Sequence, residues 1–291
     1  TVNPSAQVNA VSNQTVCNGT NTTAIAFGTA NTGGTTSYTW TNDNTAIGLG
    51  ASGSGNIASF TTVNSGTTPI TATITVTPVY TSGAVTCSGT PKSFTITVNP
   101  GATINPVSNQ LVCAGANTTA VTFGGTVAGT TYLWTNDTPS IGLGATGTGD
   151  IASFTAVNTG ISPVTATITV TPRFTNGSAI CDGTPTSFTI TVNPTATVNA
   201  VSNQVVCNGG NTTAVTFSSP TTGGAIVYNW TNNNTSIGLG ASGTGDIPSF
   251  TAVNTGTAPV SATITVTPAY TNGSVTCNGT ARTFTITVNP T

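Results

Sequence analysis

One unit of roughly 100 residues, the size of an ordinary domain, is repeated three times along this chain. The word VSNQ stands near the start of each copy and FTITVNP closes each copy. Solenoid repeats are shorter, at about 20–45 residues, so we expect three folded domains in a row. The copies are Ser5–Pro100, Gly101–Pro194 and Thr195–Pro290, preceded by a stub, Thr1–Pro4, and followed by Thr291.

The stub has the sequence TVNP, which is the end of the closing word. We therefore interpret Thr1–Pro4 as the end of a preceding repeat and the chain as part of a longer array, although a processed mature start would look the same. The sequence contains no basic segment followed by an apolar core, and no apolar run near the ~20 residues that span a bilayer. We expect no membrane contact within this segment.

Charged side chains are almost absent. Lys92, Arg173 and Arg282 are the three cations, the five acidic residues are all Asp, and there is no His, Glu or Met. Three cations cannot neutralise a phosphate backbone, which argues against a nucleic-acid partner. No His or Lys recurs in all copies to act as a general base or to activate a Ser or Thr. We expect neither enzyme activity nor a cofactor.

The six cysteines fall two to a copy, separated by 70, 68 and 70 residues. Zinc sites use four clustered ligands, and neither CxxC pairs nor His are present. We therefore expect one disulfide within each repeat, which indicates an oxidising, extracellular compartment and could stabilise each domain by roughly 4 kcal/mol. Two buried free thiols per domain are the alternative. The expected pairs are Cys17 with Cys87, Cys113 with Cys181 and Cys207 with Cys277.

Alternation of Thr with apolar residues predicts strands. In Thr71–Thr77 every Thr faces one way and Ala, Ile and Val face the other, and Phe94–Val98 repeats the pattern. No stretch has a helical apolar period. The fold class we predict is all-β, with three tandem immunoglobulin-like antiparallel β-sandwich domains. Further strands are expected near Gln7–Val11, Thr23–Phe27, Ser37–Thr41 and Ser59–Val63.

Each copy also carries one Trp and ends in Asn-Pro. Trp40, Trp134 and Trp230 lie between the two cysteines of their copies, and we expect them in the core. The second cysteine, in Cys87-Ser88-Gly89, lies near a hairpin, so the bridge could join loops instead of pinning two sheets. Asn99-Pro100 joins the first two copies without a spacer, which favours a stiff rod that gains about 35–40 Å per domain.

Together, the Trp, IGLGASGTGDI-SFTA-N, ATITVTP, Cys-x-Gly-Thr and FTITVNP resemble the PKD-like repeats of very large secreted proteins of Bacteroidota. The resemblance covers essentially all of each copy. It implies an immunoglobulin-like sandwich, export to the cell surface and a role in adhesion, filaments or gliding, with no catalytic residues. The acidic, Trp-centred signature of better-known PKD domains is absent, because Thr41-Asn42-Asp43 follows Trp40.

Three other patterns point elsewhere. Gly48–Gly53 matches GxGxxG, but a β segment follows instead of the helix that a dinucleotide site needs, so these glycines fit a tight edge strand or bulge better. Asp43 and Asp137 align with Asn233, which favours a turn over a calcium site. Asn-x-Ser/Thr triplets leave glycan attachment open; examples begin at Asn21, Asn117, Asn176, Asn211 and Asn272.

Two functions fit these residues. The first is a structural module of an extracellular filament, stalk or adhesin, whose partners are other copies of itself or adjacent repeats. Here the FTITVNP strand is expected to be an exposed edge that pairs with another chain. The second is a carbohydrate- or surface-binding module that recognises surface glycans through exposed aromatics. Its candidates are Tyr38, Tyr80 and the loop around Trp40.

Overall fold

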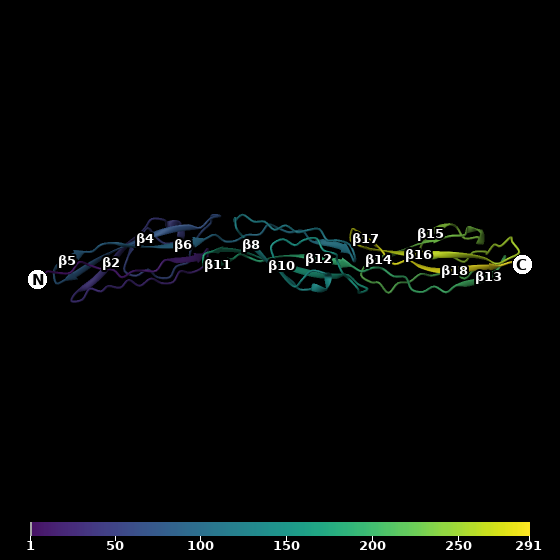
Figure 1. Ribbon diagram of the computed structural model, residues 1–291, viewed down its shortest axis with the longest axis horizontal. Helices are drawn as coiled ribbons and strands as arrows, with labels where there is room; N and C mark the ends of the chain where they lie inside the picture. Colours follow the sequence, from purple (N-terminus) through teal and green to yellow (C-terminus); the bar gives the residue numbers. More distant parts are fainter. Residues whose placement is uncertain (1) are drawn as a thin grey trace.

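The computed structural model describes residues 2–291 as three all-β domains of one design, arranged in a row with the two termini at opposite ends (Figure 1). Each domain is built on one six-stranded sheet with the same strand order. In the first repeat the order is β1-β6-β4-β2-β3, and β5 pairs with one end of β4. Its strands are β1 (Gln14–Cys17), β2 (Thr35–Asn42), β3 (Ser52–Ser54), β4 (Ile70–Ser82), β5 (Val85–Ser88) and β6 (Lys92–Asn99).

The second and third repeats reproduce this plan strand for strand. A single 3₁₀ turn follows the Trp strand in each copy: η1 (Thr45–Ile47), η2 (Pro139–Ile141) and η3 (Thr235–Ile237). The second sheet consists of β7 (Gln110–Cys113), β8 (Thr131–Asn136), β9 (Thr146–Thr148), β10 (Val164–Asn176), β11 (Ala179–Asp182) and β12 (Thr186–Asn193). The third consists of β13 (Gln204–Cys207), β14 (Ala225–Asn232), β15 (Ser242–Thr244), β16 (Val260–Asn272), β17 (Val275–Asn278) and β18 (Arg282–Asn289).

The Thr alternation of the central strands divides a dry face from a hydroxyl-rich face. On β4, Ala72, Ile74 and Val76 are almost completely buried. The intervening Thr side chains face outward, and the Thr71 hydroxyl lies 2.9 Å from that of Thr97 on β6. Such cross-strand pairs stabilise a sheet without charge. The predicted alternation is therefore confirmed, and it produces a surface of hydroxyl groups over an aliphatic core.

The closing FTITVNP strand is not an edge. β6 pairs antiparallel with β4 on one side and parallel with β1 on the other, where Cys17 lies opposite Asn99. The expectation that this strand is free to pair with another chain is therefore wrong. The strands at the two ends of the order, β1 and β3, have only four and three residues, and short edge strands are poor templates for pairing.

A second layer covers the dry face of the sheet, and it is less regular than we expected. Gln7–Val11, Thr23–Phe27 and Ser59–Val63 form no strands, whereas Ser37–Thr41 lies within β2. Isolated bridges such as Ile25 with Ile57 join the segments of this layer. Side chains replace the ladder: Asn56 Oδ1 accepts from the amide of Phe27, and the Thr22 hydroxyl accepts from the amide of Phe60. Asn and Thr compete in this way with regular strand pairing.

The glycine-rich words shape the pocket that holds the Trp. Trp40 is buried, as expected. Gly48 ends η1 with φ of 94°, a left-handed conformation that favours glycine. Gly53 lies on β3 opposite Trp40, and a Cβ there would overlap the indole ring. The GxGxxG match therefore leads into a short edge strand, as predicted, and the last glycine gives the indole its space.

Replacing Gly53 by Ala should destabilise the first repeat by about 1–3 kcal/mol, because the added methyl group forces the indole out of its place. Denaturant unfolding followed by Trp fluorescence would measure the change. Gly50→Ala is the matched control, since a Cβ at Gly50 meets nothing within 4 Å, and its effect should stay within about 0.5 kcal/mol. Equal effects of the two substitutions would show that the contact with Trp40 is unimportant.

Candidate functional site at the joints between repeats

The disulfides join neighbouring repeats, and the expectation of one bridge within each repeat is wrong. Cys17 of the first repeat is bonded to Cys181 of the second, and Cys113 of the second to Cys277 of the third. Each bridge spans 164 residues of sequence. The first cysteine of one repeat thus pairs with the second cysteine of the next. Within residues 2–291, Cys87 and Cys207 are the cysteines left free.

The sheet explains why a repeat cannot close its own bridge. Cys17 lies beside Asn99, at the downstream end of β6. Cys87 lies on β5, which pairs with the far end of β4, beyond the start of β6 at Lys92. The eight residues of β6 alone cover about 25 Å, whereas bonded cysteines need Cα atoms within about 7 Å. The two cysteines of a repeat therefore lie at opposite ends of its sheet.

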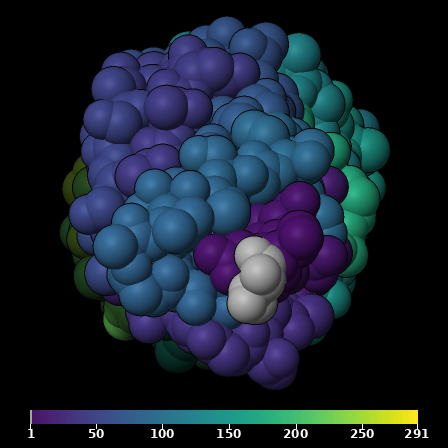
Figure 2. All heavy atoms as spheres, turned by 90° about the vertical axis from the view of Figure 1, so that its left-hand side faces the viewer, coloured from purple at the N-terminus to yellow at the C-terminus, as the bar shows by residue number. Residues whose placement is uncertain are grey.

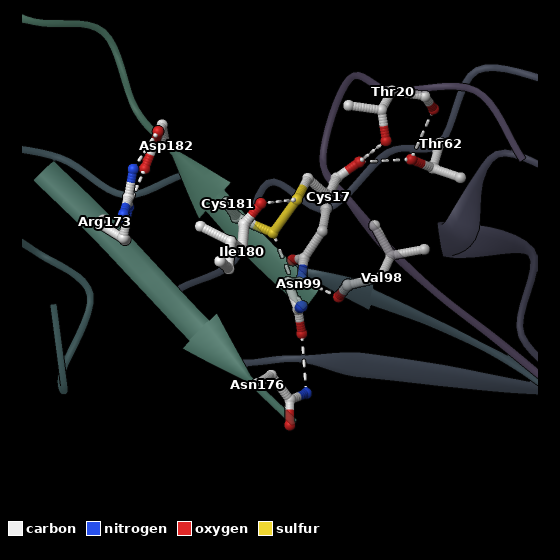
Figure 3. Close-up of a disulfide and its surroundings, with 11 residues drawn as sticks. Cys17, Thr20, Thr62, Val98, Asn99, Arg173, Asn176, Ile180, Cys181 and Asp182 are labelled. Carbon is white, nitrogen blue, oxygen red and sulfur yellow. Dashed lines mark hydrogen bonds and ion pairs between the residues drawn. A yellow bond between two sulfur atoms is a disulfide. The ribbon is translucent and has the colours of Figure 1, made fainter. Parts of the chain in front are cut away.

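The first joint has a buried amide at its centre (Figure 3). Asn99, the last residue of β6, has no exposed surface. Its Oδ1 accepts a hydrogen bond of 2.8 Å from Asn176 Nδ2 of the next repeat, and its Nδ2 donates to Cys181 Sγ at 3.6 Å. Cys17 Sγ lies 3.3 Å from the carbonyl oxygen of Ile180. One polar side chain thus contacts both the bridge and the hairpin that carries it.

The second joint has the same Asn–Asn hydrogen bond, but its buried Asn193 Nδ2 has no hydrogen-bond partner among the described residues, whereas Asn99 Nδ2 donates to sulfur. Asn193 is completely buried, and its Oδ1 accepts from Asn272 Nδ2 at 2.9 Å. A backbone hydrogen bond of 2.8 Å also crosses this joint, from the amide of Thr222 to the carbonyl of Ile161. Each joint therefore combines the continuous chain, a disulfide and an Asn–Asn hydrogen bond. Two covalent connections side by side resist bending more than one.

The first joint also carries an ion pair, the one that the structure shows among residues 2–291. Arg173 Nε lies 2.6 Å from Asp182 Oδ1, and Arg173 Nη2 lies 2.8 Å from Asp182 Oδ2. The guanidinium lowers the pKa of the Asp182 carboxyl through its hydrogen bonds. Both side chains are about a third or more exposed, so this pair contributes little to stability. It lies beside the bridge in Figure 3 and is not part of its buried centre.

The Asp and Asn residues considered for calcium have a structural role. Asp43, Asp137 and Asn233 each accept a hydrogen bond from a backbone amide of the central strand of their repeat. A carboxylate and an amide oxygen can both do this, which explains why Asp and Asn interchange. The described part of the chain contains no cluster of three or more His, Cys, Asp or Glu that could hold a metal ion.

The hydrogen bonds to Asp137 predict an acid-sensitive second repeat. The amide of Thr167 and the hydroxyl of Thr138 both donate to its Oδ1 and lower its pKa. Because the pKa falls on folding, this stabilisation is present above the unfolded value and is lost as pH drops through the folded value, below about pH 4. Denaturation midpoints at pH 7 and pH 3 should therefore differ less in Asp137→Asn than in the unaltered chain. An unchanged difference would contradict this role.

The aromatic candidates for glycan recognition are buried. Tyr38 and Tyr80 are 9% and 2% exposed, and the Tyr80 hydroxyl donates to the carbonyl of Thr32 at 2.9 Å. These rings pack in the core or close a loop, and they do not form a face that could stack on a sugar. Tyr38 and Tyr80 are therefore not exposed aromatics that could bind a glycan, and Trp40, whose loop was the third candidate, lies in the core as expected.

Two of the glycan-acceptor triplets lie within the joints. The amide nitrogens of Asn176 and Asn272 are the atoms to which a glycan would attach, and both donate across a joint to a buried Asn. A glycan at either position would separate the repeats. Asn21 forms an isolated bridge with Thr61 of its own repeat, and its Oδ1 accepts a hydrogen bond from the Thr61 hydroxyl.

In the part of the chain that the structure describes, no helix has the length and apolarity needed to cross a membrane. No protein-family model and no curated protein matches the chain.

Among solved structures, the chain matches several multi-domain proteins at low TM-score and very low sequence identity. The chain is similar to Drosophila N-cadherin EC1-4 with a TM-score of 0.37 and 11% identity, covering 100% of this chain and 76% of that one. For the human desmocollin-1 ectodomain the TM-score is 0.35 and the identity 10%, covering 99% of this chain and 62% of that one. For Sidekick-1 immunoglobulin domains 1–5 the TM-score is 0.33 and the identity 12%, covering 99% of this chain and 60% of that one. TM-scores this low carry no argument about function. The Ig-like character of the repeats therefore rests on the sheets themselves.

Proposed function

We propose that this chain is a structural module of an extracellular filament, stalk or adhesin, and that it has no enzymatic activity. In this proposal its role is to hold two points apart at a fixed distance and orientation, and its length is set by the number of repeats. We place the domain boundaries at Pro100 and Pro194, where the sequence repeat begins again. The family we propose is that of the PKD-like repeats of large secreted Bacteroidota proteins.

The structure of the joints between repeats is the main support for this proposal. A flexible string of binding modules needs no covalent link beyond the chain itself, yet here each repeat is bonded twice to the next. A fully buried Asn in each joint fixes the orientation of the neighbouring hairpin. Disulfides persist in oxidising compartments, which supports a location outside the cell. Nothing in the joint resembles a substrate site, and the expected sugar-binding aromatics are buried.

Shape under oxidising and reducing conditions tests the proposal. We would use the variant Cys87→Ser/Cys207→Ser, which keeps both bridges and removes the free thiols. Negative-stain microscopy of the oxidised protein should show straight rods of one length. After reduction the joints should bend while the circular dichroism stays the same, because each hydrophobic core lies within a single repeat. Oxidised particles that bend freely at the joints would contradict a rigid spacer.

A further inference from the structure

The two free cysteines lie at opposite ends of the molecule and are the unmatched halves of one joint. Cys87 is on β5 at the N-terminal end and Cys207 is on β13 at the C-terminal end (Figure 1). Cys87 is the second cysteine of the first repeat, equivalent to Cys181 and Cys277. Cys207 is the first cysteine of the third repeat, equivalent to Cys17 and Cys113. Each type therefore forms a disulfide wherever a neighbouring repeat is present.

The surface around each free thiol is more exposed than the equivalent surface inside a joint. Cys181 and Cys277 are 2% and 4% exposed inside the joints, whereas Cys87 is only partly buried. Figure 2 looks onto this N-terminal end, where a later part of the first repeat, in blue, lies beside the N-terminal residues in purple. Nearby, Val85 is 55% exposed, whereas its equivalents Ala179 and Val275 are partly covered.

At the C-terminal end, residues that would face a following repeat are also more exposed than equivalents inside the joints. Val205 on β13 is 68% exposed, whereas its equivalent Leu111 is partly buried and lies beside Gly273 of the next repeat. Asn289, which ends β18, is partly exposed, whereas Asn99 and Asn193 have no exposed surface. A thiol and an amide thus stand where the internal joints have them, and both are more exposed than their equivalents there. Val205 stands where the second repeat has Leu111 and the first has Thr15.

We propose that copies of this chain join head to tail, Cys207 of one copy forming a disulfide with Cys87 of the next, in a joint built like the two internal ones. The inference rests on the proposed function, because it extends the same joint beyond one chain. Formation of the bond requires an oxidant. A small-molecule disulfide such as oxidised glutathione accepts the two electrons and two protons of the two thiols and leaves as two thiols.

Two details of the ends agree with this joint. The stub residues Val2-Asn3-Pro4 repeat the sequence Val288-Asn289-Pro290. In the proposed joint the last residues of one copy take the place of the stub of the next copy, so that stub must move aside. Val2 is 96% exposed, so its side chain loses almost no packing contacts when the stub moves. Ser82 stands where Asn176 and Asn272 stand in the later repeats, and its hydroxyl is the donor that would face Asn289 of the other copy.

Oxidation of the full chain with a glutathione redox buffer tests the proposal. Non-reducing electrophoresis should show a ladder of multiples of 28.6 kDa that collapses to one band on reduction. Mass spectrometry of pepsin peptides should identify Cys207 bonded to Cys87; trypsin is unsuitable because the chain has three Lys and Arg in total. A chain that stays monomeric after oxidation, with both internal bridges formed, would overturn the proposal.

Single substitutions test whether the joint is head to tail. Cys87→Ser keeps only the Cys207 thiol and Cys207→Ser keeps only the Cys87 thiol, so neither should form a ladder. Mixing the two should give dimers several-fold more abundant than either variant gives alone. Equal dimer formation in the separate variants would show unspecific thiol oxidation and would overturn the proposal.

Failure of this inference is distinguishable from failure of the proposed function. The rod shape is measured on Cys87→Ser/Cys207→Ser, which cannot join end to end through these thiols. A rigid monomer that forms no ladder would therefore refute head-to-tail joining and leave the structural module intact. Removing residues 1–4 in a further variant should leave the ladder unchanged or increase its yield, because the stub no longer competes for the joint.

Discussion

Stretched from its two ends with both bridges intact, the chain should reach only about a third of the length that it reaches after reduction. The intact covalent path runs from the N-terminus to Cys17, crosses to Cys181, returns along the chain to Cys113, crosses to Cys277 and continues to the C-terminus. This path contains roughly 100 residues, or about 350 Å when extended, whereas all 291 residues extend to about 1,000 Å.

Single-molecule pulling measures this limit directly. The experiment uses the Cys87→Ser/Cys207→Ser background, with and without a reductant. Opening one bridge by Cys17→Ser/Cys181→Ser should give an intermediate limit, because the path then follows the chain to Cys113 and contains roughly 130 residues, about 450 Å. If the oxidised and reduced chains extended equally far, the bridges would not join neighbouring repeats.

Asn99→Asp should open the first joint at neutral pH. Asn99 has no exposed surface, and no cation contacts it, so a carboxylate there would be buried without a partner, at a cost of about 3–5 kcal/mol. Desolvation raises the folded pKa of the introduced carboxyl above its unfolded value of about 4. The destabilisation is therefore present above that value and disappears under acid. The yield of the Cys17–Cys181 bridge at pH 7, and denaturation midpoints at pH 7 and pH 4, would show it.

Asn289→Asp is the matched control for this substitution. Asn289 ends the same strand in the third repeat but is only partly buried, because no repeat follows it in the structure. Its replacement should change the denaturation midpoint little at either pH. If both substitutions had the same small effect, the buried amide would not contribute to holding the repeats together.

The sheet could be predicted from the sequence because its signal is local. Thr71–Thr77 alternates strictly, and the structure places these residues on the central strand with the apolar side chains buried. The second layer could not be predicted in the same way. Near Phe27 and Phe60, the acceptors for the backbone amides are the side chains of Asn56 and Thr22, which are distant in sequence, and no local pattern reports that pairing.

The disulfide pairing was predicted wrongly because separation along the chain does not report position in a repeat. A distance of 70 residues between Cys17 and Cys87 fits a bridge within one domain equally well. What decides the pairing is the parallel contact of β1 with the end of β6, which places Cys17 at the downstream joint. One signal was available: Cys87 lies in a hairpin and not in the middle of a strand, which already argued against a bridge that pins two sheets.

The joint centre was missed for a related reason. The sequence identifies Asn99 only as the residue before a proline, whereas the structure buries it between two repeats. Its burial depends on the neighbouring domain, so neither its own strand nor the composition of its repeat indicates it.

The offset of the two bridges also protects the chain against being cut. The rings closed by Cys17–Cys181 and Cys113–Cys277 overlap, so every peptide bond between Cys17 and Cys277 lies inside at least one ring. A protease that hydrolyses any one of these bonds leaves both fragments attached to each other through sulfur. Loops at the surface are the usual sites of such cleavage. In an environment rich in proteases, a single cleavage between Cys17 and Cys277 therefore leaves the two ends of the chain covalently connected.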